Sequence, residues 1–438
     1  DGGIQADGTC AKFKAVGSGA DRITFNADRT INPNAQWHGF AFTDDCGGQG
    51  EVARHVFDMV DISNTNHAAI TAGSRPADPN GPSCGTATQN CDIGEFVMND
   101  VTYTNVESAF SHGSGQGTTV TMTNFAVTDA RSSCFNFAED TIASLTGTAL
   151  NPSTMTRCNT NNLESGGAII NTPGSSAGEL TLQHVNIVDS FVSLIRIDLH
   201  DVTISDVTAT MTNNVNNPLI NLNDETGVHL SLSGGASSDV SITNFDAQNY
   251  QHGKICAANS VNMNNVNLGT GFTTGHAFDI DPYCGAITSV PGSIGANSVF
   301  DDVTAPAMAM YRTLPGTANK ITTTGDFLIA DFPAGTNSDT VEFTEASIGG
   351  SFTMDGCNAD LAISLSTVSQ LSSLCSSFLG TSSFEMIDSI ITHTSSTADV
   401  ITAEQTNGIL VNVDIDSTTA SATGPYYVSA GYDTTIFL

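Results

Sequence analysis

The chain has 438 residues, of which 39% are hydrophobic and only 13% are charged, and its formal net charge is −33 at pH 7. A negative charge of this size excludes the phosphates of nucleic acids and anionic membrane surfaces as partners. No run of about 18 apolar residues occurs, so we expect no membrane-spanning helix.

The chain opens at Asp1, with neither a Met nor a basic and apolar leader. We interpret this start as that of a secreted protein whose signal peptide has been removed. We assign residues 1–50, which contain two of the ten cysteines, to an N-terminal cap.

Residues 51–314 carry a repeated six-residue pattern: apolar, any, apolar, any, Asn or Asp, apolar. Each copy alternates as a strand with one buried face does. The closing Asn or Asp suits a bend, because both residues tolerate left-handed backbone angles. Six copies begin at Phe57, Phe96, Val120, Val202, Val240 and Val261, and near-copies begin at Leu180 and Ser298.

The polar position of each copy gives the period of the repeat. Successive positions lie 21 to 24 residues apart in three places, which is the length of one three-stranded coil of a parallel β-helix, and longer intervals leave room for insertions. This pattern resembles the pectate-lyase-like superfamily of right-handed parallel β-helices, at fold level and over roughly residues 23–303. The polar positions are Asp61, Asp100, Asn124, His184, Asp206, Asn244, Asn265 and Asp302.

We therefore expect an all-β, right-handed parallel β-helix, a solenoid with disulfide-stapled loop insertions and a less regular C-terminal part. Residues 51–314 are assigned to this β-helix. An antiparallel β-sandwich is the alternative, but it needs a hairpin turn every ~8–12 residues. The chain has few of the Asn-Gly and Asp-Gly pairs that make such turns.

The ten cysteines predict disulfides, because no Cys-x-x-Cys or Cys-x-x-His spacing indicates a zinc site. Pairing of consecutive cysteines would staple the insertions of the repeat. Disulfides require an oxidising compartment, so we expect a secreted protein, extracellular or on a cell surface. The predicted pairs are Cys10–Cys46, Cys84–Cys91, Cys134–Cys158, Cys256–Cys284 and Cys357–Cys375.

From residue 315 the repeat loosens, and we expect residues 315–438 to continue the β-helix or to form a C-terminal β-rich cap. Weaker copies of the pattern begin at Val341, Phe384 and Ile409. One apolar series in this region fits a short helix and a buried bend equally well. Its members are Leu365, Val368, Leu371, Leu374 and Phe378.

The superfamily that the pattern resembles contains polysaccharide lyases and hydrolases, so the resemblance raises the question of a catalytic set. A lyase needs basic residues, and residues 97–303 hold one Lys and three Arg. A hydrolase needs paired carboxylates, but the polygalacturonase motifs fail at most steps, and His112 is predicted to be a surface-loop histidine. No phosphate loop, dinucleotide fingerprint or nucleophile elbow occurs. If the protein is an enzyme, its candidate carboxylates are Asp279, Asp281, Asp301 and Asp302.

Calcium is the expected cofactor, because several short segments concentrate the hard oxygen ligands that it prefers. No twelve-residue calcium-loop motif accompanies them. The candidate ligands are Asp279 and Asp281, Asp414 and Asp416, and the loop residues Asp355, Asn358 and Asp360.

These observations favour a secreted, self-assembling structural protein of the extracellular space or cell surface, a subunit of a filament, sheath or layer, with other copies of itself as partners. The alternative is a β-helical polysaccharide lyase or glycoside hydrolase acting on an extracellular glycan. An ice-binding threonine ladder is a weaker alternative, since Thr121, Thr181 and Thr203 share one position of the repeat but the ladder is interrupted. A glycan-binding tailspike is weaker too, because such proteins are poor in disulfides.

Overall fold

The computed structural model divides the chain into two compact units. Unit 1 comprises Asp1–Ser238 and Ala247–Gln251, and unit 2 comprises Asp239–Asp246 and His252–Leu438. The residues that the structure describes are 4–6, 12–18, 21–27, 35–42, 54–72, 94–112, 118–138, 141–161, 167–171, 178–190, 193–198, 200–210, 228–248, 250–268, 278–281, 298–311, 317–330, 339–355, 359–374, 382–393, 400–404, 406–417, 428–430 and 434–437.

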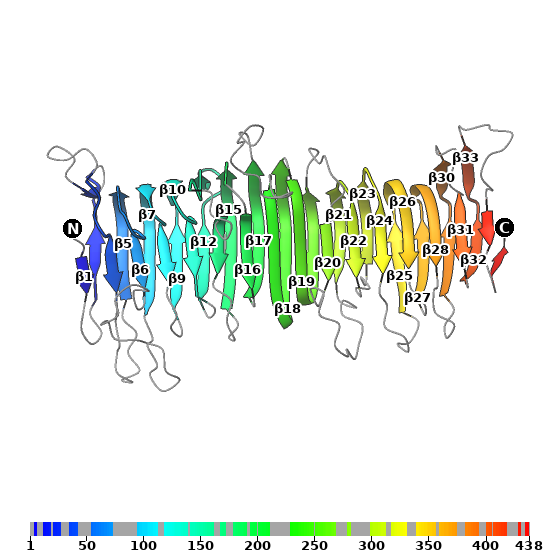
Figure 1. Ribbon diagram of the computed structural model, residues 1–438, viewed down its shortest axis with the longest axis horizontal. Helices are drawn as coiled ribbons and strands as arrows, with labels where there is room; N and C mark the ends of the chain where they lie inside the picture. Colours follow the sequence, from blue (N-terminus) through cyan, green and yellow to red (C-terminus); the bar gives the residue numbers. More distant parts are fainter. Residues whose placement is uncertain are drawn as a thin grey trace. The chain divides into compact units, whose positions relative to one another are not determined.

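Unit 1 is built from short strands (Figure 1). In chain order they are β1 (Ile4–Ala6), β2 (Lys14–Val16), β3 (Ile23–Asn26), β4 (Phe40–Phe42), β5 (Arg54–Ser63), β6 (Ile70–Ala72), β7 (Glu95–Val106), β8 (Phe110–His112), β9 (Thr119–Thr123), β10 (Ala126–Ala130), β11 (Phe135–Phe137), β12 (Ile142–Thr146), β13 (Ser153–Thr156), β14 (Gly167–Asn171), β15 (Gly178–Val188), β16 (Ser193–Asp198) and β17 (His200–Thr210). The long strands β18 (Val228–Gln248) and β19 (Tyr250–Asn267) contribute residues to both units.

Unit 2 continues with strands of similar length. They are β20 (Phe278–Asp281), β21 (Val299–Ala305), β22 (Met308–Tyr311), β23 (Thr317–Thr323), β24 (Phe327–Ala330), β25 (Asp339–Thr344), β26 (Ser347–Asp355), β27 (Ala359–Ser364), β28 (Thr367–Leu374), β29 (Ser382–Ile387), β30 (Ile390–His393), β31 (Ile401–Glu404), β32 (Thr406–Val411), β33 (Asp414–Ser417), β34 (Val428–Ala430) and β35 (Thr435–Phe437). No helix in the described part of the chain is long and apolar enough to cross a membrane.

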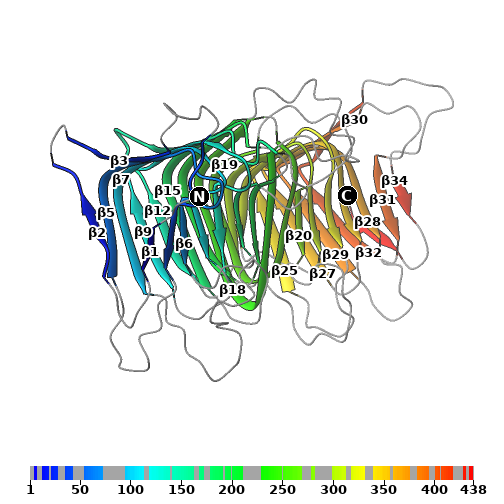
Figure 2. The ribbon, with the colours of Figure 1, turned by 60° about the vertical axis from the view of Figure 1, so that its left-hand side comes forward.

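In each unit the strands stack in parallel ladders, so the expected all-β, parallel β-helix is confirmed. Three faces of each coil carry a ladder, as Figure 2 shows for the stacked ribbons. In unit 1, β9, β12 and β15 pair on the first face, β10, β13 and β15 on the second, and β8, β11 and β14 on the third. In unit 2, β27, β29 and β32 continue the first-face pattern.

The polar position of the repeat is the corner between the first and second faces. Residues at this corner have a φ of 47–55°, in the left-handed region that Asn and Asp tolerate better than most side chains. The corner of one coil is tied to the next by the backbone, as when the Asn124 N–H donates to the Thr146 carbonyl at 2.9 Å. Seven predicted positions are confirmed: Asp100, Asn124, His184, Asp206, Asn244, Asn265 and Asp302.

The predicted position of the first copy is wrong by two residues. Strand β5 pairs with β7 so that Met59, with a φ of 55°, lies at the corner beside Asp100. Asp61 instead pairs with Thr102 on the second face. The repeat pattern predicts the corner at Asp61 because Met59 is apolar and therefore fits the alternating part of the pattern.

The same corner continues through residues 315–438. The copies that begin at Val341 and Phe384 predict their corners correctly, at Glu345 and Asp388. The copy at Ile409 is misplaced by one residue, since the corner is Asn412. Two further corners belong to no copy of the repeat pattern, and their residues are neither Asn nor Asp: Lys320 and Leu365.

The apolar series from Leu365 forms no helix. Leu365 is a corner residue with a φ of 51°, and Val368, Leu371 and Leu374 lie on strand β28. Strand β28 turns from the second face to the third, pairing first with β30 and then with β31. Phe378 lies outside the described residues, and the domain boundaries at residues 50 and 314 remain predictions.

The core of each unit lies between the faces, where inward side chains stack coil upon coil. On the first face of unit 1, one such stack consists of residues that are all 0% exposed. Burial of each of these side chains stabilises the fold by about 1.5–3 kcal/mol. The stack is Phe57, Met98, Met122, Leu145, Leu182 and Ile204.

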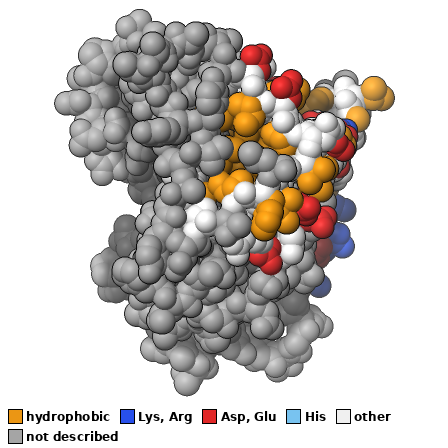
Figure 3. Space-filling view, turned by 90° about the vertical axis from the view of Figure 1, so that its right-hand side faces the viewer, with side chains coloured by type: hydrophobic (Ala, Val, Ile, Leu, Met, Phe, Trp, Pro, Cys, Tyr) orange, Lys and Arg blue, Asp and Glu red, His pale blue; other side chains and the backbone are white. Residues whose placement is uncertain are grey.

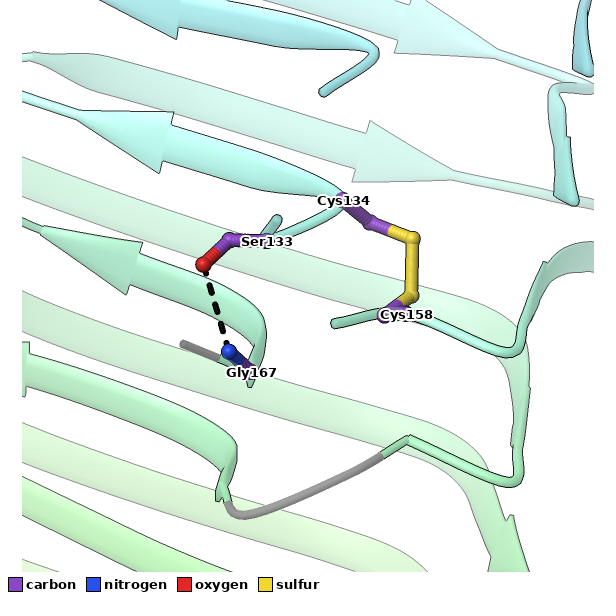
Figure 4. Close-up of a disulfide and its surroundings, with 4 residues drawn as sticks. All are labelled: Ser133, Cys134, Cys158 and Gly167. Carbon is purple, nitrogen blue, oxygen red and sulfur yellow. Dashed lines mark hydrogen bonds between the residues drawn. A yellow bond between two sulfur atoms is a disulfide. The ribbon is translucent and has the colours of Figure 1, made fainter. Parts of the chain in front are cut away.

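One predicted disulfide is confirmed (Figure 4). Cys134 and Cys158 are joined across 24 residues of sequence, and both are fully buried. The adjacent Ser133 hydroxyl accepts a hydrogen bond from the Gly167 N–H at 3.2 Å. The other four predicted pairs lie outside the described residues; for Cys256 only the backbone, within β19, is described.

Candidate functional site

The outer face of the last first-face strands of unit 2 is apolar. Ile409 and Val411 on β32 are 43% and 47% exposed, and Phe437 on β35 is 62% exposed. The register pairs Ile387 with Val411 and Ile409 with Phe437, so these four side chains are neighbours. We call them the C-terminal apolar face. Figure 3 shows hydrophobic side chains beside carboxylates on the described part of the surface in that view. Exposed apolar side chains that gather in this way mark contact surfaces.

The same positions in unit 1 are mostly polar, with the half-buried Val56 on β5 and Val97 on β7 as exceptions. Strand β9 presents Thr121 and Thr123, and β15 presents Thr181 and Gln183. Neighbouring strands with several exposed large apolar side chains at these positions are therefore a property of the last coils, since Val56 and Val97 are not among the exposed large hydrophobic residues. Its sequence signal is the continuous apolar run in β32, where alternation with polar residues stops.

The electrostatic surroundings of the C-terminal apolar face are wholly acidic. No Lys or Arg follows Lys320 in the sequence. Glu342 and Glu385 lie on the outer side of the same sheet face, and Asp388 lies at its corner, all three exposed. Two copies that approach through this face repel each other unless cations or salt screen the charge.

The strands at the end of each ladder in unit 2 are paired on one side only. Among the described residues, β33 pairs with β30, β34 with β31 and β35 with β32. An edge of this kind presents unpaired N–H and C=O groups that can take up another strand. In β35 the edge lies directly beside the exposed Phe437.

A groove of about 570 Å³ crosses the third face of unit 2. Its floor is the outer side of three stacked strands, where Ala309, Leu328 and Thr353 are in register. Tyr311 and Asp326 also line it. The lining thus combines apolar carbons, hydroxyls, an aromatic ring and one carboxylate.

The carboxylate of the groove is held by the next coil. The Ser351 N–H donates to Asp326 Oδ1 at 2.8 Å. Strand β26 has a β-bulge at Gly349 and Gly350, and a Cβ atom on Gly350 would collide with this carboxylate oxygen. The bulge and its glycines therefore position Asp326, as β-bulges near binding sites commonly do.

Two of the candidate catalytic carboxylates occupy structural positions on the first face. Asp301 accepts hydrogen bonds from Asn264 Nδ2 at 3.3 Å and from Asn319 Nδ2 at 2.7 Å, one on each carboxylate oxygen. Asp302 is the corner residue, as the repeat predicted. A catalytic role for either carboxylate remains a prediction.

The other two candidates lie on strand β20. The register places Asp279 beside Ala309, so its backbone continues the row that forms the floor of the groove. The side chain of Asp281 lies outside the described residues. The sequence therefore predicted Asp279, which lies next to the groove, but not Asp326 and Tyr311, which belong to no recognisable sequence motif.

The candidate calcium ligands are dispersed. Asp414 and Asp416 are exposed on β33, and Asp360 accepts a hydrogen bond from the Ser383 hydroxyl. Asp355 is exposed at the end of β26, and Asn358 lies outside the described residues. Within the described ranges, no group of three or more His, Cys, Asp or Glu side chains could hold a metal ion. Calcium binding stays a prediction.

The interpretation of His112 as a surface-loop residue is wrong. It ends strand β8 on the inward side, is 2% exposed, and lies 2.8 Å from the Thr141 hydroxyl and 3.0 Å from the Thr118 hydroxyl. Burial lowers its pKa to about 4. The prediction failed because the glycines after His112 indicate a loop, whereas His112 is the last residue of β8 and takes one of its inward positions.

Comparison of the chain with protein families, with curated proteins and with solved structures found no match. Inference of a function therefore rests on the fold, the C-terminal apolar face and the groove.

Proposed function

We propose that this protein is a secreted structural subunit that assembles with copies of itself in the extracellular space or on a cell surface. The observation that carries the proposal is the C-terminal apolar face. Ile409, Val411 and Phe437 expose apolar surface there, and the neighbouring Ile387 is half-buried. Beside them lies the edge of β35, which has no second partner among the described strands. Burial of such a surface against another copy is favourable by about 25 cal/mol per Å².

Because the chain is strongly negative, we expect its assembly to depend on ionic strength and on divalent cations. With a net charge of −33, copies repel one another at low ionic strength. Calcium or another divalent cation would reduce the repulsion at exposed carboxylates such as Asp414 and Asp416. We therefore propose calcium-promoted assembly into filaments, sheaths or layers.

The test is negative-stain electron microscopy of the purified chain, with millimolar calcium and with EDTA. We expect ordered assemblies with calcium and their loss in the double variant Ile409→Asp, Val411→Asp. The matched control is Thr121→Asp with Thr123→Asp, at the equivalent positions of unit 1. Discrete single molecules in every condition would refute the proposal.

A second candidate function is supported by the groove of unit 2. We propose that, if the chain acts on or binds an extracellular glycan, it does so there. This candidate includes membership of the pectate-lyase-like superfamily, which the resemblance of the repeat implies. Asp326 in the lining and the net charge of −33 disfavour polyuronates and favour a neutral glycan.

This candidate is tested by affinity electrophoresis and reducing-end release on neutral and acidic polysaccharides. We expect retardation by a neutral polymer, lost in Tyr311→Ala and weakened in Asp326→Asn. The double variant Asp279→Asn, Asp301→Asn tests whether the predicted carboxylates act in hydrolysis. Equal mobility with every polysaccharide contradicts the candidate.

A further inference from the structure

We infer that copies of this chain join head to tail, with β35 of one copy adding in parallel to β2 of the next copy and β34 adding to β1. This inference rests on the proposed function and names its partner and contact. Among the described residues, β2 pairs only with β5, and β35 pairs only with β32. Both strands belong to the first face.

The two edges, each without a second partner among the described strands, are complementary in direction. Strand β2 has its partner in the following coil, whereas β35 has its partner in the preceding coil. On the third face, β1 pairs only with the later β4, and β34 only with the earlier β31, among the described strands. The first and third faces of one end can therefore meet the first and third faces of the other end in parallel, and the backbone groups of both edges gain partners.

The inward and outward side chains of β2 and β35 also alternate so that inward residues of one strand meet inward residues of the other. On β2, Ala15 faces the core at 5% exposure, and Val16 faces outward at 41%. Phe13 lies on the same side as Ala15, packs against the rings of the N-terminal core and remains partly exposed. On β35, Ile436 pairs with the buried Gly408 and so faces inward, where a docked copy offers Phe13.

The outward side chains at the two edges are complementary in packing and in charge. Phe437 of one copy would lie beside Lys14 of the next, whose methylene groups can cover the ring while the ammonium group stays in water. Lys12 and Lys14, two of the four lysines, lie at this edge and are exposed. The opposite edge belongs to the segment after Lys320, which has no basic residue except histidine. Two C-terminal edges would bring acidic surface against acidic surface, and two N-terminal edges would bring lysines against lysines, so unlike edges are the favoured pair.

The test uses one variant at each edge, studied by sedimentation velocity and native mass spectrometry in calcium. We expect Lys14→Glu and Phe437→Asp to be monomeric when separate, with the thermal midpoint of each close to that of the parent chain. Mixing the two variants should restore dimers and nothing larger, because one intact pair of edges remains. Thr181→Glu, on the outer side of the same face in unit 1, should assemble like the parent.

Two outcomes would overturn the head-to-tail contact while leaving self-assembly in place. One is that both edge variants assemble like the parent chain. The other is that each is monomeric and their mixture stays monomeric, although both are folded. If the parent chain itself never assembles, the proposed function fails first, and that result is distinguishable from either of these.

Discussion

At the scale of single residues, the corner positions show how side-chain choice and backbone conformation are linked. An L-residue in the left-handed region costs about 1–2 kcal/mol, and Asn and Asp visit the region more readily than other side chains. Most corners carry Asn or Asp, but Leu365 adopts a φ of 51° and is 58% exposed. This leucine therefore carries a conformational cost without burying its side chain.

Replacement of Leu365 by Asn should therefore stabilise unit 2. We expect Leu365→Asn to raise the free energy of unfolding by about 1 kcal/mol, measured by urea denaturation at low ionic strength. Leu361→Asn is the control, because Leu361 is 1% exposed and its replacement should lower stability by several kcal/mol. A lower midpoint for Leu365→Asn would contradict this conformational role of the corner residue.

Two buried histidines of unit 1 make its stability depend on pH. His55 lies between the rings of Phe42 and Phe96, at centroid distances of 4.2 and 4.9 Å, and neither ring nitrogen has a hydrogen-bond partner. Burial lowers the pKa values of His55 and His112 to about 4. Between that value and the ordinary value of about 6.5, the unfolded chain binds more protons than the folded chain.

Unit 1 should accordingly lose stability as the pH falls through this window. Between pH 7 and pH 5 we expect a loss of about 2 kcal/mol for each histidine. His55→Phe should remove its share of the loss, which urea denaturation at the two pH values can measure. Equal pH dependence in the variant and the parent chain would show that His55 does not carry this effect.

At the scale of strands and loops, the features that depend on alternation and on corner chemistry could be predicted from the sequence. These are the strands of the regular coils and seven of the eight corners predicted for residues 51–314, six of which carry Asn or Asp in a left-handed backbone conformation. Corners at Met59, Lys320 and Leu365 could not be predicted, because these side chains give no local signal. The C-terminal apolar face and the groove depend on which strands become neighbours, and a repeat pattern does not contain that information.

The contribution of the disulfide between Cys134 and Cys158 to the stability of unit 1 can be measured. It closes a loop of 24 residues, so its removal should destabilise unit 1 by about 3 kcal/mol, mainly through the entropy of the unfolded chain. The double variant Cys134→Ala, Cys158→Ala should show this loss in chemical denaturation. An unchanged midpoint would mean that the surrounding coils, and not the disulfide, fix this loop.

At the scale of the whole molecule, the surface proposed for association carries both apolar side chains, which attract another copy, and acidic side chains, which repel it. The C-terminal apolar face favours association, while the acidic side chains around it and the net charge of −33 oppose it. Screening therefore decides between dispersed and assembled chains. Salt should promote assembly in the same direction as calcium, but calcium should act at a much lower concentration if it binds carboxylates directly.

The measurement that tests self-assembly most directly is sedimentation velocity of the purified chain across a titration of sodium chloride and of calcium. We expect a monomer at low ionic strength in EDTA, and larger species that grow as either salt rises. We also expect EDTA to reverse the effect of calcium. A single boundary of monomer size across both titrations would contradict self-assembly.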